Sequence, residues 1–197
     1  MAIRRPMKKP TSGTEVFATV ARTGTGANAT IDSGFPVDMY LMQKRSSVAY
    51  QNIADRLRGG GKMSLTYTTD AEQETNDSSI RGFDSNTQVL LGTDSNEYVN
   101  SPGVKYANQM FRRAPGFFDV VCYTGDGTGA KAFTHNLGVA PGLMIVKARS
   151  TTGNWPVYFG DKDGSCYLNL TNANNNPNGT WGGIAPTSTN FTVSGAY

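Results

Sequence analysis

The chain has 197 residues, 17% of which are charged, and a formal net charge of +3. This length allows one large domain or two small ones, each with a usable core. Abundant glycine (23 residues) with frequent Asn, Ser and Thr favours short strands joined by turns over long helices. No stretch reaches the roughly 18 apolar residues of a membrane-spanning helix. Residues 1–10 lack the apolar run of a signal peptide, so we expect synthesis in the cytoplasm.

The positive charge is concentrated at the N-terminus. Residues 1–10 contain no acidic residue, and their four basic residues are Arg4, Arg5, Lys8 and Lys9. Subtracting these four charges leaves the other residues close to neutral, so binding of nucleic acid by a basic face is not expected. Two prolines, Pro6 and Pro10, keep the segment extended. We interpret residues 1–13 as a basic arm that docks on another protein, with a disordered solubilising tail as the alternative.

Two long segments share the same landmarks in the same order. Residues 17–46 and 118–150 each contain an apolar strand, a Thr-Gly turn, a glycine-rich tip, a Gly-x-x-Pro-like corner, a second apolar strand and then Arg-Ser. Arg45 of the first segment matches Arg149 of the second, 104 residues later, while the Thr-Gly turns lie 101 residues apart. The length difference falls in the glycine-rich tips, where insertions cost little. The sequence therefore predicts a tandem duplication.

The local patterns within this repeat are those of strands. Residues 16–21 and 118–123 mix β-branched and aromatic residues over about six positions, a normal strand length. Residues 39–42 and 143–146 are continuously apolar, which predicts strands buried on both faces. We therefore expect an all-β fold.

Other segments give weaker predictions. Residues 157–159 and 166–170 predict a hairpin across a glycine-containing tip. Residues 48–58 have apolar side chains at helical spacing and could hold the one short helix. Residues 70–79 are acidic and polar, which favours an exposed loop.

These elements predict two tandem antiparallel β-sandwich domains, with a jelly-roll variant left open. Copy 1 spans residues 14–113 and copy 2 spans residues 114–197. Copy 1 continues through residues 97–111, a stretch without a counterpart in copy 2. Either the sequence is cut short there, or a neighbouring chain donates the missing strand to an unpaired edge.

Several segments together resemble a module that recurs in tail-fibre-like virion proteins of tailed phages, notably marine and cyanobacterial phages. In copy 2 they are residues 116–129 (GFFDVVCYTGDGTG), 135–150 (HNLGVAPGLMIVKARS), 154–158 (NWPVY), 167–173 (YLNLTNA) and 185–191 (APTSTNF). In copy 1 they are residues 33–38 (SGFPVD), 44–46 (KRS) and 82–86 (GFDSN). The resemblance implies a non-catalytic β-sandwich building block of a virion appendage, located in the virion.

The resemblance also implies partners. Other virion proteins of the tail, neck, fibre or capsid are the expected ones, and a homotrimer or higher ring is the expected assembly. The chain is short and lacks a long fibre shaft, which favours an adaptor or fibre base. Two alternatives remain open: a module that binds a host receptor or surface glycan, and a capsid decoration or head-fibre protein. We expect no enzymatic activity and no cofactor or metal.

Aromatic residues and the single histidine are the most distinctive candidate residues. Trp155, Trp181 and Tyr158 could stack on a sugar, with a role in the core as the default. His135 lacks a nucleophile elbow or oxyanion signature nearby, so we expect it to cap backbone amides in a turn.

The remaining candidates favour structural roles. The four acids Asp70, Glu72, Glu74 and Asp77 lie in one polar stretch, where we expect solvated carboxylates rather than a paired acid site. Residues 24–26 and 125–129 lack phosphate-loop spacing and are interpreted as hairpin tips. Residues 161–164 only faintly suggest a calcium loop. Cys122 and Cys166 are expected to be buried and apolar.

Overall fold

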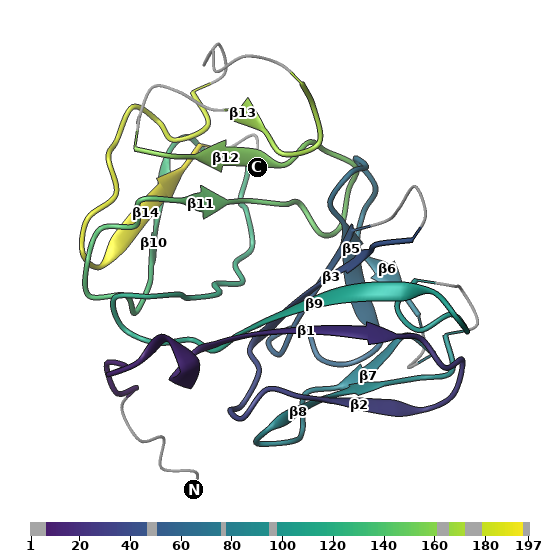
Figure 1. The fold of residues 1–197 in the computed structure, drawn as a ribbon. Coiled ribbons are helices and arrows are strands. Elements are labelled where there is room, and N and C mark those ends of the chain that lie inside the picture. Colours follow the sequence, from purple (N-terminus) through teal and green to yellow (C-terminus); the bar gives the residue numbers. More distant parts are fainter. Residues whose placement is uncertain are drawn as a thin grey trace, which may run out of the picture.

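A computed structural model describes residues 7–46, 51–75, 78–94, 98–160, 166–171 and 179–194. These residues form fourteen strands and a 3-10 helix, which confirms the all-β class (Figure 1). No helix formed by these residues has the length and apolar character of a membrane span. The elements are η1 (Gly13–Glu15), β1 (Phe17–Thr23), β2 (Ala29–Asp32), β3 (Met39–Lys44), β4 (Gln51–Asp55), β5 (Lys62–Leu65), β6 (Gln73–Glu74), β7 (Ile80–Gly82), β8 (Gln88–Leu91), β9 (Lys105–Phe111), β10 (Lys131–Thr134), β11 (Met144–Ile145), β12 (Pro156–Tyr158), β13 (Cys166–Tyr167) and β14 (Asn190–Val193).

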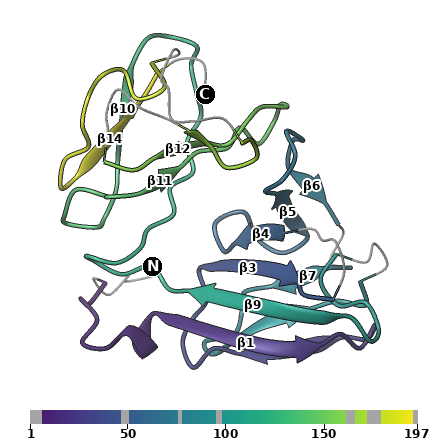
Figure 2. The ribbon, with the colours of Figure 1, turned by 45° about the horizontal axis from the view of Figure 1, so that its top comes forward.

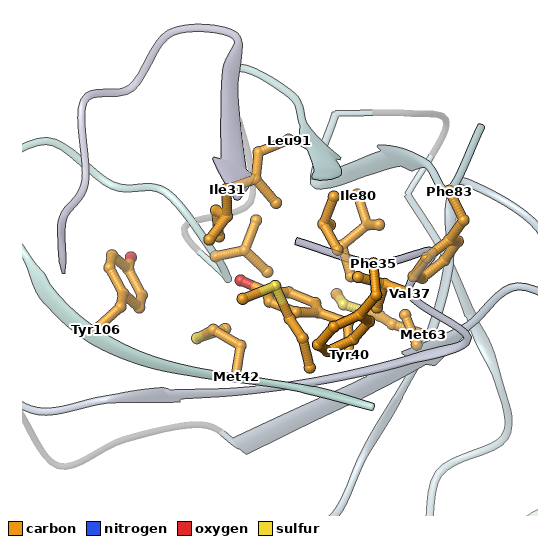
Figure 3. Packing of buried hydrophobic residues seen from close by; sticks show 14 of the residues in the cluster. Ile31, Phe35, Val37, Tyr40, Met42, Met63, Ile80, Phe83, Leu91 and Tyr106 are labelled. Atoms are coloured by element: carbon orange, nitrogen blue, oxygen red, sulfur yellow. The ribbon is translucent and has the colours of Figure 1, made fainter. Parts of the chain in front are cut away.

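The first half of the chain is a β-sandwich. A six-stranded sheet of order β1-β9-β3-β4-β5-β6 packs against a three-stranded sheet of order β2-β8-β7. Side chains alternate along each strand, so Tyr40 and Met42 of β3 point into the core and meet Ile31 and Leu91 from the opposite sheet (Figure 3). In Figures 1 and 2 the six-stranded sheet lies between the smaller sheet and the second half of the chain.

The second half has a smaller core. It contains a three-stranded sheet of order β11-β12-β13 and a two-stranded sheet of order β10-β14. Its buried apolar cluster comprises Val146, Tyr158, Trp181, Phe191 and Val193. The hairpin expected in this half is confirmed, because β12 and β13 pair antiparallel.

The strand pairs of the two halves repeat in the same register. Ile31 lies opposite Val89 in the first half, and the residues 102 positions later, Phe133 and Phe191, lie opposite each other in the second. All four strands in this comparison pair antiparallel. Two further pairs also recur: Leu41–Ile53 as Ile145–Val157, and Ile53–Ser64 as Val157–Cys166. The duplication in sequence is therefore also a duplication of strand pairing.

Among the described residues, the second half shows no counterpart strand for β1, β6, β7 or β9 of the first half. In the first half β9 lies between β1 and β3 and pairs with both, so that Phe111 is opposite Phe17 on one side and Met39 on the other. The strand expected at residues 118–123 is not formed. A strand is stabilised by hydrogen bonds to a neighbouring strand, and no described strand pairs with residues 118–123.

Two further expectations need correction. Residues 51–55 form strand β4 rather than a helix, because Asn52 and Ala54 face the core while Ile53 faces away at the alternation of a strand. Residues 48–50 lie outside the described part of the chain. The stretch expected to be a plain loop contains β6, which pairs with β5.

The glycines at residues 24–26 do not form a hairpin tip. β1 pairs with β9, whereas the following β2 pairs with β8, so this connection passes from one sheet to the other. The backbone of Gly24 packs so closely on the loop before β9 that an added Cβ would lie 2.2 Å from the carbonyl oxygen of Ser101. Glycine is needed here for close approach of two backbone segments.

A candidate binding cleft between the two halves

A cleft of about 760 Å³ lies between the six-stranded sheet and the second half. Its floor is the outer face of the sheet and includes Met39, Leu41 and Ile53. Residues 116–123 and 139–147 line the opposite side. Most of the side chains that line the cleft are apolar, so it is suited to an apolar chain segment rather than to a highly charged ligand.

The floor of the cleft differs from the usual outer face of a sandwich. An antiparallel sheet with one buried face normally carries polar residues on the other. Here Met39 and Leu41 of β3 alternate with the core residues Tyr40 and Met42, so apolar side chains occupy both faces of the strand. The second half covers part of this outer face and leaves the cleft.

The opposite wall exposes large apolar side chains. Leu143 is 61% exposed and Ile145 is 42% exposed, while Val146 belongs to the core. The expectation that residues 143–146 are buried on both faces is therefore wrong for the isolated chain. Val139, on the same wall, is 51% exposed. Apolar side chains that gather in this way mark a surface for interaction.

The largely buried carboxylate of Glu72 connects the two halves at the polar end of the cleft. Glu72 accepts two hydrogen bonds from Arg149, from Nε to Oε2 and from Nη2 to Oε1, each 3.0 Å long. Arg58 donates to the same carboxylate at 3.1 Å and also pairs with Asp55. Glu72 and Arg58 come from the first half and Arg149 from the second, so the network joins the halves through a charged centre.

The charges of this network shift the pKa of Glu72. Burial alone would raise it, but hydrogen bonds from Arg149 and Arg58 outweigh burial, and the net effect is a lowered pKa. Glu72 correspondingly raises the pKa of Arg149. The carboxylate is therefore ionised at neutral pH and forms ion pairs with Arg58 of the first half and Arg149 of the second.

Backbone groups extend the contact between the halves. The indole Nε1 of Trp155 donates to the carbonyl oxygen of Thr68 at 3.0 Å. The carbonyl oxygen of Thr69 accepts from the amide of Gly153 at 2.7 Å and from Nζ of Lys147 at 3.2 Å. The loop between β5 and β6 is thus the first half's main attachment to residues 147–155.

The comparison with known families covers almost the whole chain. Residues 12–197 match a family described as a domain of unknown function, DUF7483. The chain belongs to this family. Among curated proteins and among solved structures, no match is found. The match includes both halves and the cleft between them.

Glu72 corrects the expectation of four solvated acids. Its side chain is 9% exposed and paired, whereas Asp70 and Glu74 are exposed as expected. Asp77 lies outside the described residues. No local pattern distinguishes Glu72 from its acidic neighbours, because its partners Arg58 and Arg149 lie 14 and 77 positions away along the chain.

His135 has the expected structural role. Its Nδ1 accepts the backbone N–H of Leu137 at 3.2 Å, which places the ring proton on Nε2. Nε2 therefore donates to the carbonyl oxygen of Thr187, 3.1 Å away. The side chain joins the turn after β10 to the turn before β14, and its capping of a backbone amide is confirmed.

The aromatic candidates for glycan contact are buried. Trp155 is 4% exposed, Trp181 is fully buried, and Tyr158 is 4% exposed. Trp181 and Tyr158 pack edge to face with ring centroids 5.6 Å apart. The default expectation of a core role is confirmed for these three residues, and the alternative of surface contacts with a sugar is corrected, because their rings stabilise the core and the junction between the halves.

The other candidates lie at the surface or outside the described residues. Lys8 and Lys9 of the arm are exposed, while Arg4 and Arg5 are not described. Residues 161–164 are also not described. Cys122 is exposed at the cleft rather than buried, and Cys166 is half-buried. In the described part of the chain, no three His, Cys, Asp or Glu side chains gather in a way that could hold a metal ion.

Proposed function

We propose that the protein is a non-enzymatic structural component of a phage virion, an adaptor or appendage module. It assembles through its N-terminal arm and through the surfaces of its two halves. The observation that carries this proposal is the exposed apolar wall formed by Val139, Leu143 and Ile145 beside an apolar cleft. Exposed apolar side chains do not stabilise an isolated domain, whereas a subunit of an assembly buries them against its neighbours.

The arm provides the second point of attachment in this proposal. Lys8 and Lys9 extend from the sandwich as exposed cations, and Ser12 caps the short helix η1 that ends the arm. An extended basic segment can become ordered along an acidic surface of a neighbouring virion protein. Homotrimers or higher rings fit this mode, because each subunit can offer its apolar wall to the next.

The glycan-binding alternative has less support. Stacking on a sugar requires an accessible aromatic face. Trp155 and Trp181 make their contacts in the interior, and Trp155 also uses its indole N–H in the junction between the halves.

Incorporation into particles tests the virion proposal. Particles assembled in the phage that encodes the protein should contain it, as shown by mass spectrometry of purified virions. Replacing Arg4, Arg5, Lys8 and Lys9 by Glu should remove it from particles, while the matched control Lys105→Glu, an exposed lysine of β9, should not. Virions that lack the wild-type protein would overturn the proposal, and normal incorporation of the arm variant would overturn the role of the arm.

A further inference from the structure

We propose that two copies of this chain pair through the free edge of strand β1, so that their six-stranded sheets join into one continuous sheet. The two β1 strands run antiparallel and are related by a two-fold axis that passes between their Val20 residues. No residue of β1 lines the cleft, so this interface is separate from the apolar wall. The inference goes beyond the proposed function and does not depend on whether the protein is a virion component.

Strand β1 lies at the outer edge of the six-stranded sheet (Figure 2). On its inner side it pairs with β9, where the amide of Arg112 donates to Val16 O and the amide of Gly24 donates to Val104 O, each at 2.8 Å. Hydrogen-bonded positions alternate in an antiparallel pair, so the backbone groups directed toward β9 are those of residues 18, 20 and 22. The backbone groups directed toward the free edge are therefore those of residues 17, 19, 21 and 23.

The backbone along this free edge is available for pairing. Within the described part of the chain, β9 is the only strand that pairs with β1, and no backbone hydrogen bond involves residues 17, 19, 21 or 23. All four of these residues are exposed. Unpaired amide and carbonyl groups along a strand are the groups that bind an added strand.

The other edge strands of the first half carry features that discourage pairing. The opposite edge of the same sheet, β6, has only two residues, and its Glu74 side chain is 71% exposed. In the smaller sheet, β7 has three residues and an irregular register against β8, while β2 has four residues and ends at Asp32. Short length, charge and bulges protect an edge from association. β1 has seven residues and contains no proline, lysine or acidic residue, which indicates an edge that is covered on assembly.

The single charged residue of β1 does not obstruct this pairing. Arg22 donates from Nη1 to Asn100 Oδ1 at 2.8 Å and from Nη2 to the carbonyl oxygen of Val99. Its guanidinium also lies 4.8 Å from the ring centroid of Tyr106. These contacts hold the charge within its own sandwich. In the proposed pair, Arg22 lies opposite Ala18 of the second copy, so no like charges face each other.

The sequence of β1 is complementary to itself when the two-fold axis passes at Val20. All seven residues then lie opposite a residue of the second copy, and the four outward-directed residues occupy the hydrogen-bonded positions. Phe17 lies opposite Thr23 of the second copy, which makes an aromatic and β-branched pair of the kind that stabilises sheets. Thr19 lies opposite Ala21 of the second copy.

Phe17 shows what the second copy would cover. Its ring packs against Phe111 of β9, with ring centroids 5.0 Å apart, yet the residue is still 37% exposed. The added strand would extend this cross-strand row and remove more of the ring from water. A second copy therefore satisfies the outward backbone groups, covers an exposed aromatic ring and buries no unpaired charge.

The oligomeric state of the full chain tests the interface. Sedimentation velocity between about 5 and about 500 µM should show the wild type changing from one copy to two copies per particle. Thr19→Pro removes an amide that points to the free edge, where proline is tolerated, and should weaken dimerisation at least about tenfold. The matched control Thr19→Val keeps the amide and the β-branched shape and should change dimerisation less than about threefold. Circular dichroism establishes that both variants are folded.

Charge substitution across the axis tests the register and remains decisive if Thr19→Pro does not fold. Two double variants are made, Thr19→Lys with Ala21→Lys and Thr19→Glu with Ala21→Glu. Because residues 19 and 21 lie opposite each other in the pair, each double variant brings like charges together and should be monomeric where the wild type is dimeric. An equimolar mixture of the two double variants brings opposite charges together and should dimerise.

Four results would overturn the proposal. The first is a wild-type chain that is monomeric at about 500 µM, and the second is a folded Thr19→Pro variant that dimerises as tightly as Thr19→Val. The third is a double variant that dimerises by itself like the wild type. The fourth is a mixture of the two double variants that stays monomeric.

Discussion

The guanidinium of Arg149 and the carboxylate of Glu72 form a bidentate pair, with both hydrogen bonds 3.0 Å long. The two residues are 77 positions apart and belong to different halves. Because the geometry of a bidentate pair is narrowly defined, this contact contributes, with those of Trp155, Lys147 and Gly153, to how the second half lies on the first. It therefore also contributes to the width of the cleft between them.

Replacing Glu72 by Gln should loosen this junction. The amide cannot balance two guanidinium groups, and Arg58 keeps only Asp55 as a charged partner. Removing one partner of a buried pair leaves an uncompensated charge, so we expect a loss of about 2–3 kcal/mol in the free energy of unfolding. Urea denaturation followed by tryptophan fluorescence measures it, because Trp155 lies at the junction.

Glu74→Gln is the matched control for this substitution. Glu74 is two residues away, is 71% exposed, and lies 3.8 Å from Nζ of Lys62. An exposed pair of this kind contributes little, so a change below about 0.5 kcal/mol is expected. Equal effects of the two substitutions would show that Glu72 does not hold the junction.

The junction should weaken in acid. The folded state lowers the pKa of Glu72 below its usual value of 4.5, so its stabilising contribution is complete above that pH. The contribution is lost as the pH falls through the lowered pKa of the folded state. Thermal unfolding between pH 7 and pH 3 should therefore show a smaller decline for Glu72→Gln than for the wild type. Parallel declines would contradict the assignment.

His135→Ala should destabilise the second half. The substitution removes the acceptor for the Leu137 amide and the donor to Thr187 O at a buried position. Two lost hydrogen bonds of this kind correspond to about 2 kcal/mol. Hydrogen exchange in β10 and β14 should accelerate, while exchange in β2 and β8 stays unchanged. Ser188→Ala, at a nearby exposed position, serves as the control and should leave β10 and β14 as they are.

Gly24→Ala should destabilise the first half strongly. The new Cβ would lie 2.2 Å from Ser101 O, a backbone atom that cannot move aside cheaply. We expect a loss of about 3 kcal/mol, read from the urea midpoint. Gly13→Ala is the control, because a Cβ there meets nothing within 4 Å. If Gly24→Ala and Gly13→Ala have the same urea midpoint, the close packing of these two backbone segments does not contribute to the stability of the first half.

The sequence was a good guide wherever a pattern is local or repeated. Turn composition and short apolar runs indicated an all-β fold, and the order of landmarks indicated the duplication. The prediction of a helix over residues 48–58 was wrong for residues 51–55. It relied on Ile53 and Leu57 being one helical turn apart, whereas β4 is determined by its pairing with β3 and β5. Long-range pairing overrides a weak local preference.

The candidate site was harder to predict because its residues meet only in the folded chain. Glu72 lies in an acidic stretch and resembles its exposed neighbours, yet Arg149 comes from the other half to pair with it. Leu143 and Ile145 have the pattern of a buried strand and are exposed in the single chain.

Amide hydrogen exchange at residues 120–123 is the most direct test of the claim that this stretch lacks the strand pairing that its counterpart β1 has in the first half. In the isolated chain these amides should exchange much faster than those of β1, which are paired with β9. Amides at residues 120–123 that are as protected as those of β1 in the isolated chain would contradict the claim.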